Sequence, residues 1–193
     1  MGVPCEDRDS KTAWRSRLLA ARQAGPASSR AADARALTDA IATVTGNTVC
    51  GYLPVGVEPG SAAMLDALVA AGRRVLLPVV TGAAPLDWAE YTGPDALRPG
   101  PHGLREPAGR RLGPAAIREA DTVLVPALAV DRRGVRLGRG GGHYDRSLPL
   151  TVPGTPLVAV IRDDEWVQLL PDEPHDVRMT AVLTPRLGLV ELC

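Results

Sequence analysis

The residues best suited to chemistry lie in one stretch, GVRLGRGGGHYDRSL, at positions 134–148. Glycine dominates it, and Arg136 and Arg139 stand between the glycines. Glycine is unfavourable inside a strand or helix because it loses the most backbone freedom on folding. Consecutive glycines let backbone N–H groups converge on one point, and arginines add forked, charged donors that match phosphate oxygens. The stretch therefore predicts a site that binds a phosphate or a similar anion.

Two questions about this stretch stay open at the level of residues. It could be a flexible surface hairpin, although such a hairpin has no need of alternating arginines followed by Tyr144 and Asp145. It matches neither the Walker loop GxxxxGK[ST] nor a GxGxxG fingerprint after a strand. Asp145 could cap the start of a helix at HYDRSL, or it could bind Mg2+ together with the distant Asp176. Either carboxylate suits Mg2+, which needs only one or two of them when phosphates supply the other oxygens.

The elements that must position this loop alternate between helices and strands. Helices are predicted from the N-cap Ser10 to Gly25, from Ser28 to Val44, from Ser61 to Ala71 and at 115–120. Strands are predicted at 48–53, 74–80, 86–93, 121–130, 156–161, 180–184 and, as an edge strand, 187–192. The Pro- and Gly-rich stretch 93–107 is predicted to be a loop.

This order of elements predicts one three-layer α/β domain over residues 1–193, with a mainly parallel sheet and helices on both faces. Ligands of such folds bind at the carboxyl ends of the strands. The first helix is expected to bury Trp14, Leu18 and Ala21 on one face and to carry Arg15, Arg17 and Arg22 elsewhere. Residues 1–9 are expected to be flexible.

The composition narrows the class of protein. The chain has 193 residues, of which 45% are hydrophobic, and its formal net charge is zero. One core is therefore expected, without a general attraction to nucleic acid or anionic membrane. No apolar run is long enough for a membrane span, and the N-terminus lacks an apolar signal core. Three widely spaced cysteines without a CxxC pair argue for a reducing compartment and against structural zinc, so a cytoplasmic protein is expected.

The run LVPALAVDRRGVRLGRGGGHYDRSL (124–148) resembles the signature of the 5-formyltetrahydrofolate cyclo-ligase family. Four shorter blocks also resemble segments of the family and stand in the family's order along the chain. They are KTAWR (11–15), YLPVGVEPGS (52–61), HGLREP (102–107) and PHDVRMTAVLT (174–184). The resemblance implies a three-layer α/β fold. It also implies an ATP- and Mg2+-dependent ring closure of 5-formyltetrahydrofolate to 5,10-methenyltetrahydrofolate. The implied reaction proceeds through an intermediate that is phosphorylated on the formyl oxygen, and it releases ADP and phosphate.

The resemblance also implies roles for individual residues. ATP contacts are implied for Lys11, Arg15, Arg136, Leu137, Gly138, Arg139, Gly140, Gly141, Gly142, His143 and Tyr144. Folate contacts are implied for Val55, Glu58, Arg139, Gly140, Gly141, Gly142 and His143, and Mg2+ binding for Asp145 and Asp176. Lys11, Arg139 and Tyr144 are the catalytic candidates. Tyr52, Trp88 and Tyr144 are candidates to wall a slot for the pterin, whereas Trp14 and Trp166 are expected in the core.

Some positions depart from the family pattern. Gly141 stands where some members carry lysine, His143 where tyrosine is usual, and Thr180 where aspartate is common. His143 could make binding sensitive to pH near neutrality. The departures keep open a folate- or nucleotide-binding homologue without turnover. A sugar-phosphate or acyl-transfer enzyme is a further alternative, and RNA binding is the weakest. A monomer or weak dimer without nucleic-acid or membrane partners is expected.

Overall fold

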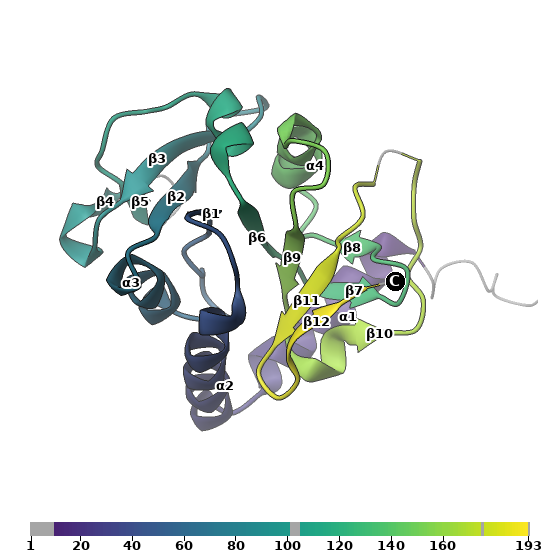
Figure 1. Cartoon of the computed structure of the whole chain (residues 1–193). Helices are drawn as coiled ribbons and strands as arrows, with labels where there is room; N and C mark the ends of the chain where they lie inside the picture. The colour runs from purple at the N-terminus through teal and green to yellow at the C-terminus, as the bar shows by residue number, and fades with distance from the viewer. Residues whose placement is uncertain (1–9, 101–104, 175, 193) are drawn as a thin grey trace, which may run out of the picture.

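The main sheet has seven strands in the order β12-β11-β9-β6-β1-β2-β3 (Figure 1). The computed structural model describes residues 10–100, 105–174 and 176–192, so the expectation for residues 1–9 lies outside it. The strands are β1 (Thr48–Cys50), β2 (Arg74–Val79), β3 (Asp87–Tyr91), β6 (Thr122–Pro126), β9 (Leu157–Val160), β11 (Ala181–Thr184) and β12 (Gly188–Glu191). The inner strands are parallel, and the two edge strands β3 and β12 are antiparallel to their neighbours. The predicted α/β fold with a mainly parallel sheet is confirmed.

Successive residues of the main strands face two different cores, one on each side of the sheet. On β6, Leu124 belongs to one core, while Val123 and Val125 belong to the other. The first core is covered by α2 (Ala27–Ala40), η2 (Ile41–Thr43) and α3 (Ala62–Ala70). The second includes residues of η5 (Pro114–Glu119), α4 (His143–Ser147) and η6 (Leu148–Leu150). Burial on both faces explains why these strands are continuous apolar runs in the sequence.

A smaller sheet carries the glycine-rich stretch. Its central strand β7 (Ala129–Asp131) pairs with β8 (Arg136–Leu137) in antiparallel and with β10 (Trp166–Val167) in parallel orientation. Helix α1 (Lys11–Ala24) lies beside this sheet (Figure 1), and its Leu18 joins a third core there. The predicted strand 121–130 is therefore wrong in its second half. The apolar run continues past Pro126, with Leu128 and Ala129 in the third core and Ala127 and Val130 in the second, so hydrophobicity alone does not reveal the break.

Local differences from the sequence prediction have simple causes. Ser10 caps α1 as predicted, with its hydroxyl accepting from the Ala13 N–H at 3.2 Å. Leu18 is buried and Trp14 is partly buried, as expected for this face of α1. Arg22 is buried instead of Ala21, which is exposed, because Arg22 has a buried acidic partner. The predicted loop 93–107 contains a hairpin of β4 (Leu97–Pro99) and β5 (Arg105–Pro107). Short 3-10 turns also occur, at η3 (Pro94–Ala96) and η7 (Asp163–Glu165).

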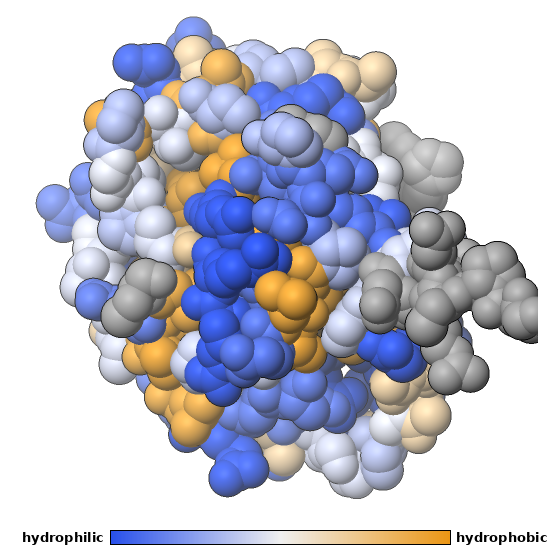
Figure 2. Space-filling view, turned by 90° about the vertical axis from the view of Figure 1, so that its right-hand side faces the viewer, coloured by the Kyte–Doolittle hydropathy of each residue, from blue (hydrophilic) through white to orange (hydrophobic). Residues whose placement is uncertain are grey.

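Three further features concern the helices, one face of the surface and the thiol of Cys50. None of the helices in the described ranges is long and apolar enough to cross a membrane. The face on the side of β8 and β10 is largely hydrophilic, with smaller hydrophobic areas (Figure 2). Cys50 is buried and unpaired, and burial raises the pKa of its thiol to about 12. A thiol with so high a pKa is unreactive near neutrality.

Candidate functional site

A cavity of about 560 Å³ lies at the carboxyl ends of β1, β2 and β6, where a mainly parallel sheet is expected to bind its ligand. Three groups of residues line it. From the main sheet and the segments after its strands come Tyr52, Leu53, Val55, Glu58, Leu77, Pro78, Val80, Gly82, Leu86, Pro126, Ala127 and Leu128. Helix α1 contributes Arg22, and β5 contributes Arg105 and Glu106. The third group is the predicted glycine loop.

Most of the predicted site residues meet in this cavity. Those that line it are Val55, Glu58, Arg136, Gly138, Arg139, Gly140, Gly141, Gly142, His143, Tyr144 and Asp145. Lys11, Arg15, Leu137 and Asp176 are not among the lining residues. Leu137 packs in the small core instead, with 1% of its surface exposed.

The Arg136 side chain is buried below the glycine loop. Its Nη2 donates to Asp145 Oδ1 at 2.5 Å, and its Nη1 lies 3.4 Å from the Pro126 carbonyl oxygen. Its guanidinium also lies over the Tyr144 ring, 5.7 Å from the centroid. Within the described residues, Arg136 Nε and the Tyr144 hydroxyl have no hydrogen-bond partner although both atoms are buried. Unpaired buried polar atoms are costly, so both are suited to a polar ligand.

Tyr144 keeps its proton under all working conditions. Burial, and secondly the nearby Glu58 carboxylate, raise the pKa of the Tyr144 phenol well above its ordinary value. A protonated phenol can donate one hydrogen bond and cannot act as a base near neutral pH. The arrangement therefore suits Tyr144 to hold an oxygen of a ligand.

Glycine is required in the loop because two arginines approach it closely. A Cβ atom at Gly138 would lie 2.7 Å from Arg136 Nη1. The Arg15 side chain of α1 donates from Nε to the Gly138 carbonyl oxygen at 3.0 Å. Gly140 has a φ of +98° and lies against the same Arg15 guanidinium. The loop thus follows a path that larger residues would block, and Arg15 acts on it from outside the cavity.

Arg139 joins the glycine loop to the segment after β1. Its Nε lies 3.1 Å from Glu58 Oε1, and its Nη2 donates to the Val55 carbonyl oxygen at 3.3 Å. The second Glu58 oxygen accepts from the Val55 N–H at 2.9 Å. Residues implied in ATP contact and residues implied in folate contact are therefore in direct contact.

His143 is held in its neutral form. Partial burial, followed by the positive charge of Arg146, lowers the pKa of the imidazole. Its Nδ1 lies 3.2 Å from Arg146 Nη2. The pH sensitivity expected near neutrality therefore moves to more acidic pH.

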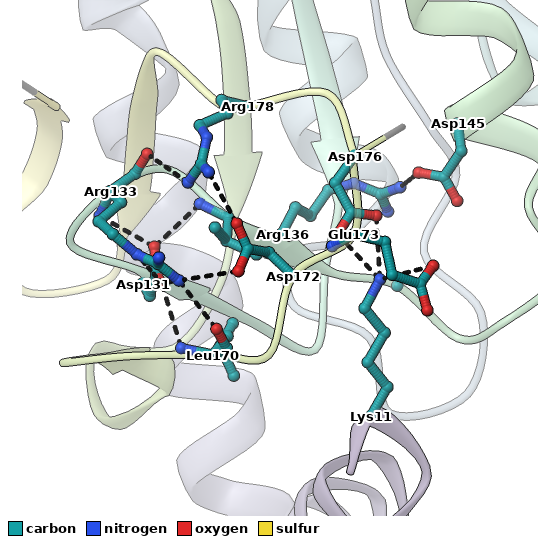
Figure 3. A network of polar contacts seen from close by, with 12 residues as sticks. Lys11, Asp131, Arg133, Arg136, Asp145, Leu170, Asp172, Glu173, Asp176 and Arg178 are labelled. Carbon is teal, nitrogen blue, oxygen red and sulfur yellow. Dashed lines mark hydrogen bonds and ion pairs between the residues drawn. The ribbon is translucent and has the colours of Figure 1, made fainter. Parts of the chain in front are cut away.

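The two predicted metal ligands are each paired with a predicted phosphate-binding cation. Asp145 accepts from Arg136, and Asp176 accepts from Lys11 Nζ at 2.8 and 3.0 Å (Figure 3). Glu173 Oε2 also lies 3.3 Å from Lys11 Nζ. In the described ranges no three His, Cys, Asp or Glu side chains are grouped as for a metal ion. Two carboxylates fit a Mg2+ ion that takes its remaining ligands from phosphates and water.

Of the three aromatic residues predicted to wall the pterin slot, two line the cavity and one does not. Tyr52 and Tyr144 line the cavity, whereas Trp88 is completely buried in the core below the sheet and does not line it. Trp14 is partly buried against the small core. Trp166 is partly buried too, but on strand β10 rather than on a helix, and Arg132 covers its ring at 3.6 Å.

Three polar residues of the cavity were missed by the sequence analysis, namely Arg22, Arg105 and Glu106. Arg22 pairs with the buried Glu165 at 2.6 Å and donates to the Ala127 carbonyl oxygen, but its Nη1 has no partner in the described part of the chain. Arg22 lies four residues after Leu18 and therefore on the same face of α1, and this spacing could have indicated that Arg22 is buried. Glu106 was quoted within HGLREP without a role, and its Oε1 is likewise buried without a partner among the described residues.

The fold and the cavity define an α/β protein with a small-molecule site built around a basic glycine loop. A sequence profile of the 5-formyltetrahydrofolate cyclo-ligase family matches residues 7–185. The 5-formyltetrahydrofolate cyclo-ligase of Mycolicibacterium smegmatis is 48% identical over 190 residues, which cover 95% of this chain and 97% of that protein. The Escherichia coli K12 protein of the same name is 32% identical over 149 residues, which cover 74% and 80%. The chain therefore belongs to the 5-formyltetrahydrofolate cyclo-ligase family and is an enzyme.

Solved structures agree with this assignment. The 5,10-methenyltetrahydrofolate synthetase of Aquifex aeolicus is similar with a TM-score of 0.76 and 25% identity, covering 94% of this chain and 92% of that one. The 5,10-methenyltetrahydrofolate synthetase of Mycoplasma pneumoniae gives a TM-score of 0.71 at 20% identity, with 90% and 97% covered. The latter similarity concerns the fold alone.

Proposed function

We propose that this enzyme converts 5-formyltetrahydrofolate to 5,10-methenyltetrahydrofolate, consuming ATP in the presence of Mg2+ and releasing ADP and phosphate. The main support is that the glycine loop, with Arg136, Arg139 and Tyr144, lines one cavity together with Glu58. Membership of the family agrees with this proposal, and so does the cyclo-ligase activity for which the 48% identical relative is named.

The reaction explains why a cavity of this composition is needed. The formyl oxygen of the substrate is a poor leaving group, so the N10 amine cannot close the ring unaided. Transfer of the terminal phosphoryl group of ATP to that oxygen releases ADP and activates the formyl carbon. N10 then attacks this carbon and loses its proton to solvent, the C–O bond breaks, and phosphate leaves. Phosphoryl transfer depends on positioning and on charge stabilisation, and it needs no nucleophile from the protein.

The residues of the loop suit the nucleotide part of this reaction. Arg136 lies buried at the cavity wall with Nε unpaired, and Tyr144 offers a protonated hydroxyl beside it. Lys11 and Arg15 approach from α1, where Arg15 already contacts Gly138. These groups would stabilise the negative charge of the phosphates and of the group in transfer.

Asp145 and Asp176 fit the metal that such a reaction requires. Both carry hard oxygen ligands, and each lies beside a cation that would contact phosphate. When bound, Mg2+ would neutralise phosphate charge and orient the terminal phosphate. Arg136 and Lys11, which pair with these carboxylates in the structure, would then be available to phosphate oxygens.

The other side of the cavity suits the folate. Glu58 offers a carboxylate that the Val55 N–H and Arg139 hold in place, and it can accept from ring N–H groups of a pterin. The Tyr52 and Tyr144 rings are candidates for the walls of the slot. Trp88 does not line the cavity, so Tyr52 and Tyr144 are the aromatic candidates for contact with the pterin.

A direct assay tests the proposal. Purified protein is mixed with MgATP and 5-formyltetrahydrofolate, and the near-ultraviolet absorbance of the methenyl product is followed, with ADP measured in parallel. We expect equal amounts of product and ADP, and no product without ATP or in the presence of EDTA. Tight binding of folate by calorimetry without ADP release would instead identify a binding protein without turnover. Product formation without ATP would also overturn the proposal.

A further inference from the structure

The hairpin that leads into the glycine loop is held by one buried carboxylate. Asp131 ends β7 and has no exposed surface. Its Oδ1 accepts from the backbone N–H groups of Arg133 and Val135, both at 2.9 Å. Its Oδ2 accepts from Arg133 Nε at 3.0 Å and from the Leu170 backbone N–H at 3.1 Å. Four donors from two separate segments therefore converge on one side chain (Figure 3).

These bonds join the hairpin turn to the segment that follows β10. Arg133 adds a bond from Nη2 to the Leu170 carbonyl oxygen at 2.9 Å. Arg178 bridges the same two segments, with Nη2 donating to Asp172 at 2.8 Å and Nη1 lying 3.4 Å from the Arg133 carbonyl oxygen. Gly134 reinforces the turn, since its carbonyl oxygen accepts from the Met179 N–H at 2.8 Å. The turn and the segment from Leu170 to Met179 thus form one unit.

Each half of this unit continues into a different part of the candidate site. The turn leads directly into Arg136, which lines the cavity, and then into the glycine loop. The segment after Leu170 carries Asp176, which holds the ammonium group of Lys11. Asp131 itself is not among the residues that line the cavity. Its carboxylate sets the relative position of Arg136 and of the Lys11–Asp176 pair without touching either.

We propose that Asp131 is a positioning residue for nucleotide binding, which acts through the hairpin turn on Arg136 and through Leu170 on the segment bearing Asp176. This inference rests on the proposed function of the cavity. Hydrogen bonds weaken steeply as their geometry departs from the optimum, so a displaced cation holds a phosphate less tightly. A residue that fixes two phosphate-binding cations at once should therefore influence nucleotide affinity more than its distance from the cavity suggests.

Asp131→Asn tests the idea with almost no change of volume. The amide keeps one acceptor oxygen and places an NH2 group where an oxygen received N–H donors, so at least one bond is replaced by repulsion. We expect the KM for MgATP to rise about tenfold or more, while kcat at saturating MgATP recovers to within roughly threefold of the unmodified enzyme. A merely structural role predicts a lower kcat with an unchanged KM for MgATP, because an unfolded fraction of the protein reduces only the amount of active enzyme.

Two control variants separate positioning from stability. Asp121 binds the N–H groups of Asn47 and Thr48 at 2.8 and 2.9 Å at the amino end of β1, so Asp121→Asn removes the same kind of interaction away from the cavity. Ile41→Ala weakens the core on the α2 side of the main sheet, which includes no residue of the hairpin. Both should lower the melting temperature and leave the KM for MgATP within about twofold.

Arg133→Ala keeps the test valid if Asp131→Asn does not fold. It removes the guanidinium bonds to Asp131 and Leu170 but spares the three backbone donors. We expect a smaller rise of the KM for MgATP, about two- to fivefold. An unchanged KM in every folded variant of this pair, or an equal rise in Asp121→Asn, overturns the inference. Unmodified protein without ATP-dependent product formation would instead overturn the proposed function.

Discussion

Arg139 is the residue that links the two sides of the cavity, through Glu58 and the Val55 carbonyl oxygen. Arg139→Ala should lower kcat/KM for MgATP by roughly 10- to 1000-fold, on the scale of losing one donor to a transition state. Stability should change little, because the Arg139 side chain is 42% exposed and exposed ion pairs contribute about 0–1 kcal/mol. Steady-state kinetics with varied MgATP, together with thermal unfolding, measure both effects.

Arg132→Ala is the matched control for this prediction. Arg132 is an exposed arginine of the same hairpin that lies over the Trp166 ring, outside the cavity. Its replacement should leave the kinetics unchanged. If Arg139→Ala behaves like Arg132→Ala, the glycine loop does not bind the nucleotide.

His143 should contribute a pH dependence on the acidic side of neutrality. Because its pKa is lowered from 6.5 in the folded protein, the unfolded chain binds more protons between the two pKa values. The free energy of unfolding therefore rises with pH up to about 6.5 and is constant above it, as far as His143 contributes. Urea unfolding of the unmodified protein and of His143→Asn over a pH series isolates this contribution.

The difference between the two proteins should fall as the pH drops below 6.5 and should be flat between pH 7 and 8. The KM for 5-formyltetrahydrofolate should be flat over the same upper range, because His143 is neutral there. A slope in the difference above pH 7 would contradict the lowered pKa.

Among the elements, the start of α1 and the segment before β11 form a contact that MgATP should change if the proposed sites are right. Lys11 Nζ lies 2.8 Å from Asp176, and these are the cation and the carboxylate that MgATP would separate. Asp176→Asn weakens this ion pair and leaves Lys11 more available to phosphate. We expect ATP to bind roughly two- to tenfold more tightly in the absence of Mg2+, the scale of one partly buried ion pair. The gain in affinity on adding Mg2+ should shrink. Calorimetry in EDTA and in Mg2+ measures both.

Asp164→Asn is the control, because it removes a charge of the same sign from an ion pair with Arg162, outside the cavity and outside the Lys11 contact. It should leave ATP binding in EDTA unchanged. Equal effects of the two variants would mean that general charge repulsion, and not release of Lys11, is responsible.

For the whole molecule, the cavity brings together three parts of the fold. Its lining comes from the main sheet, from the hairpin of the small sheet and from β5. A ligand that contacts all three should stabilise the complete fold. At a concentration 100 times its Kd it should add about 2.7 kcal/mol, or a rise in Tm of about 5–10 °C for a chain of this size. Thermal unfolding with MgATP, with 5-formyltetrahydrofolate and with both measures this, and no shift at such concentrations would speak against the cavity as the binding site.

The sequence by itself determined the α/β fold, the glycine loop and half of the residues that line the cavity. These features are encoded locally. Doubly buried strands must be continuous apolar runs, and a loop that passes close to arginine side chains must be glycine at positions such as Gly138. Because the loop follows directly on a strand, its residues stay together wherever the chain places them.

Only the tertiary structure decided which side chains met across the chain. Arg22 is buried because Glu165, 143 residues away, lies beside it, and Lys11 meets Asp176 across 165 residues. The break after Pro126 and the hairpin that presents Glu106 likewise depend on how the small sheet and β5 pack against the main one. Such contacts have no local signature, because the partner of a charged side chain is set by the packing of distant elements and not by its neighbours in sequence.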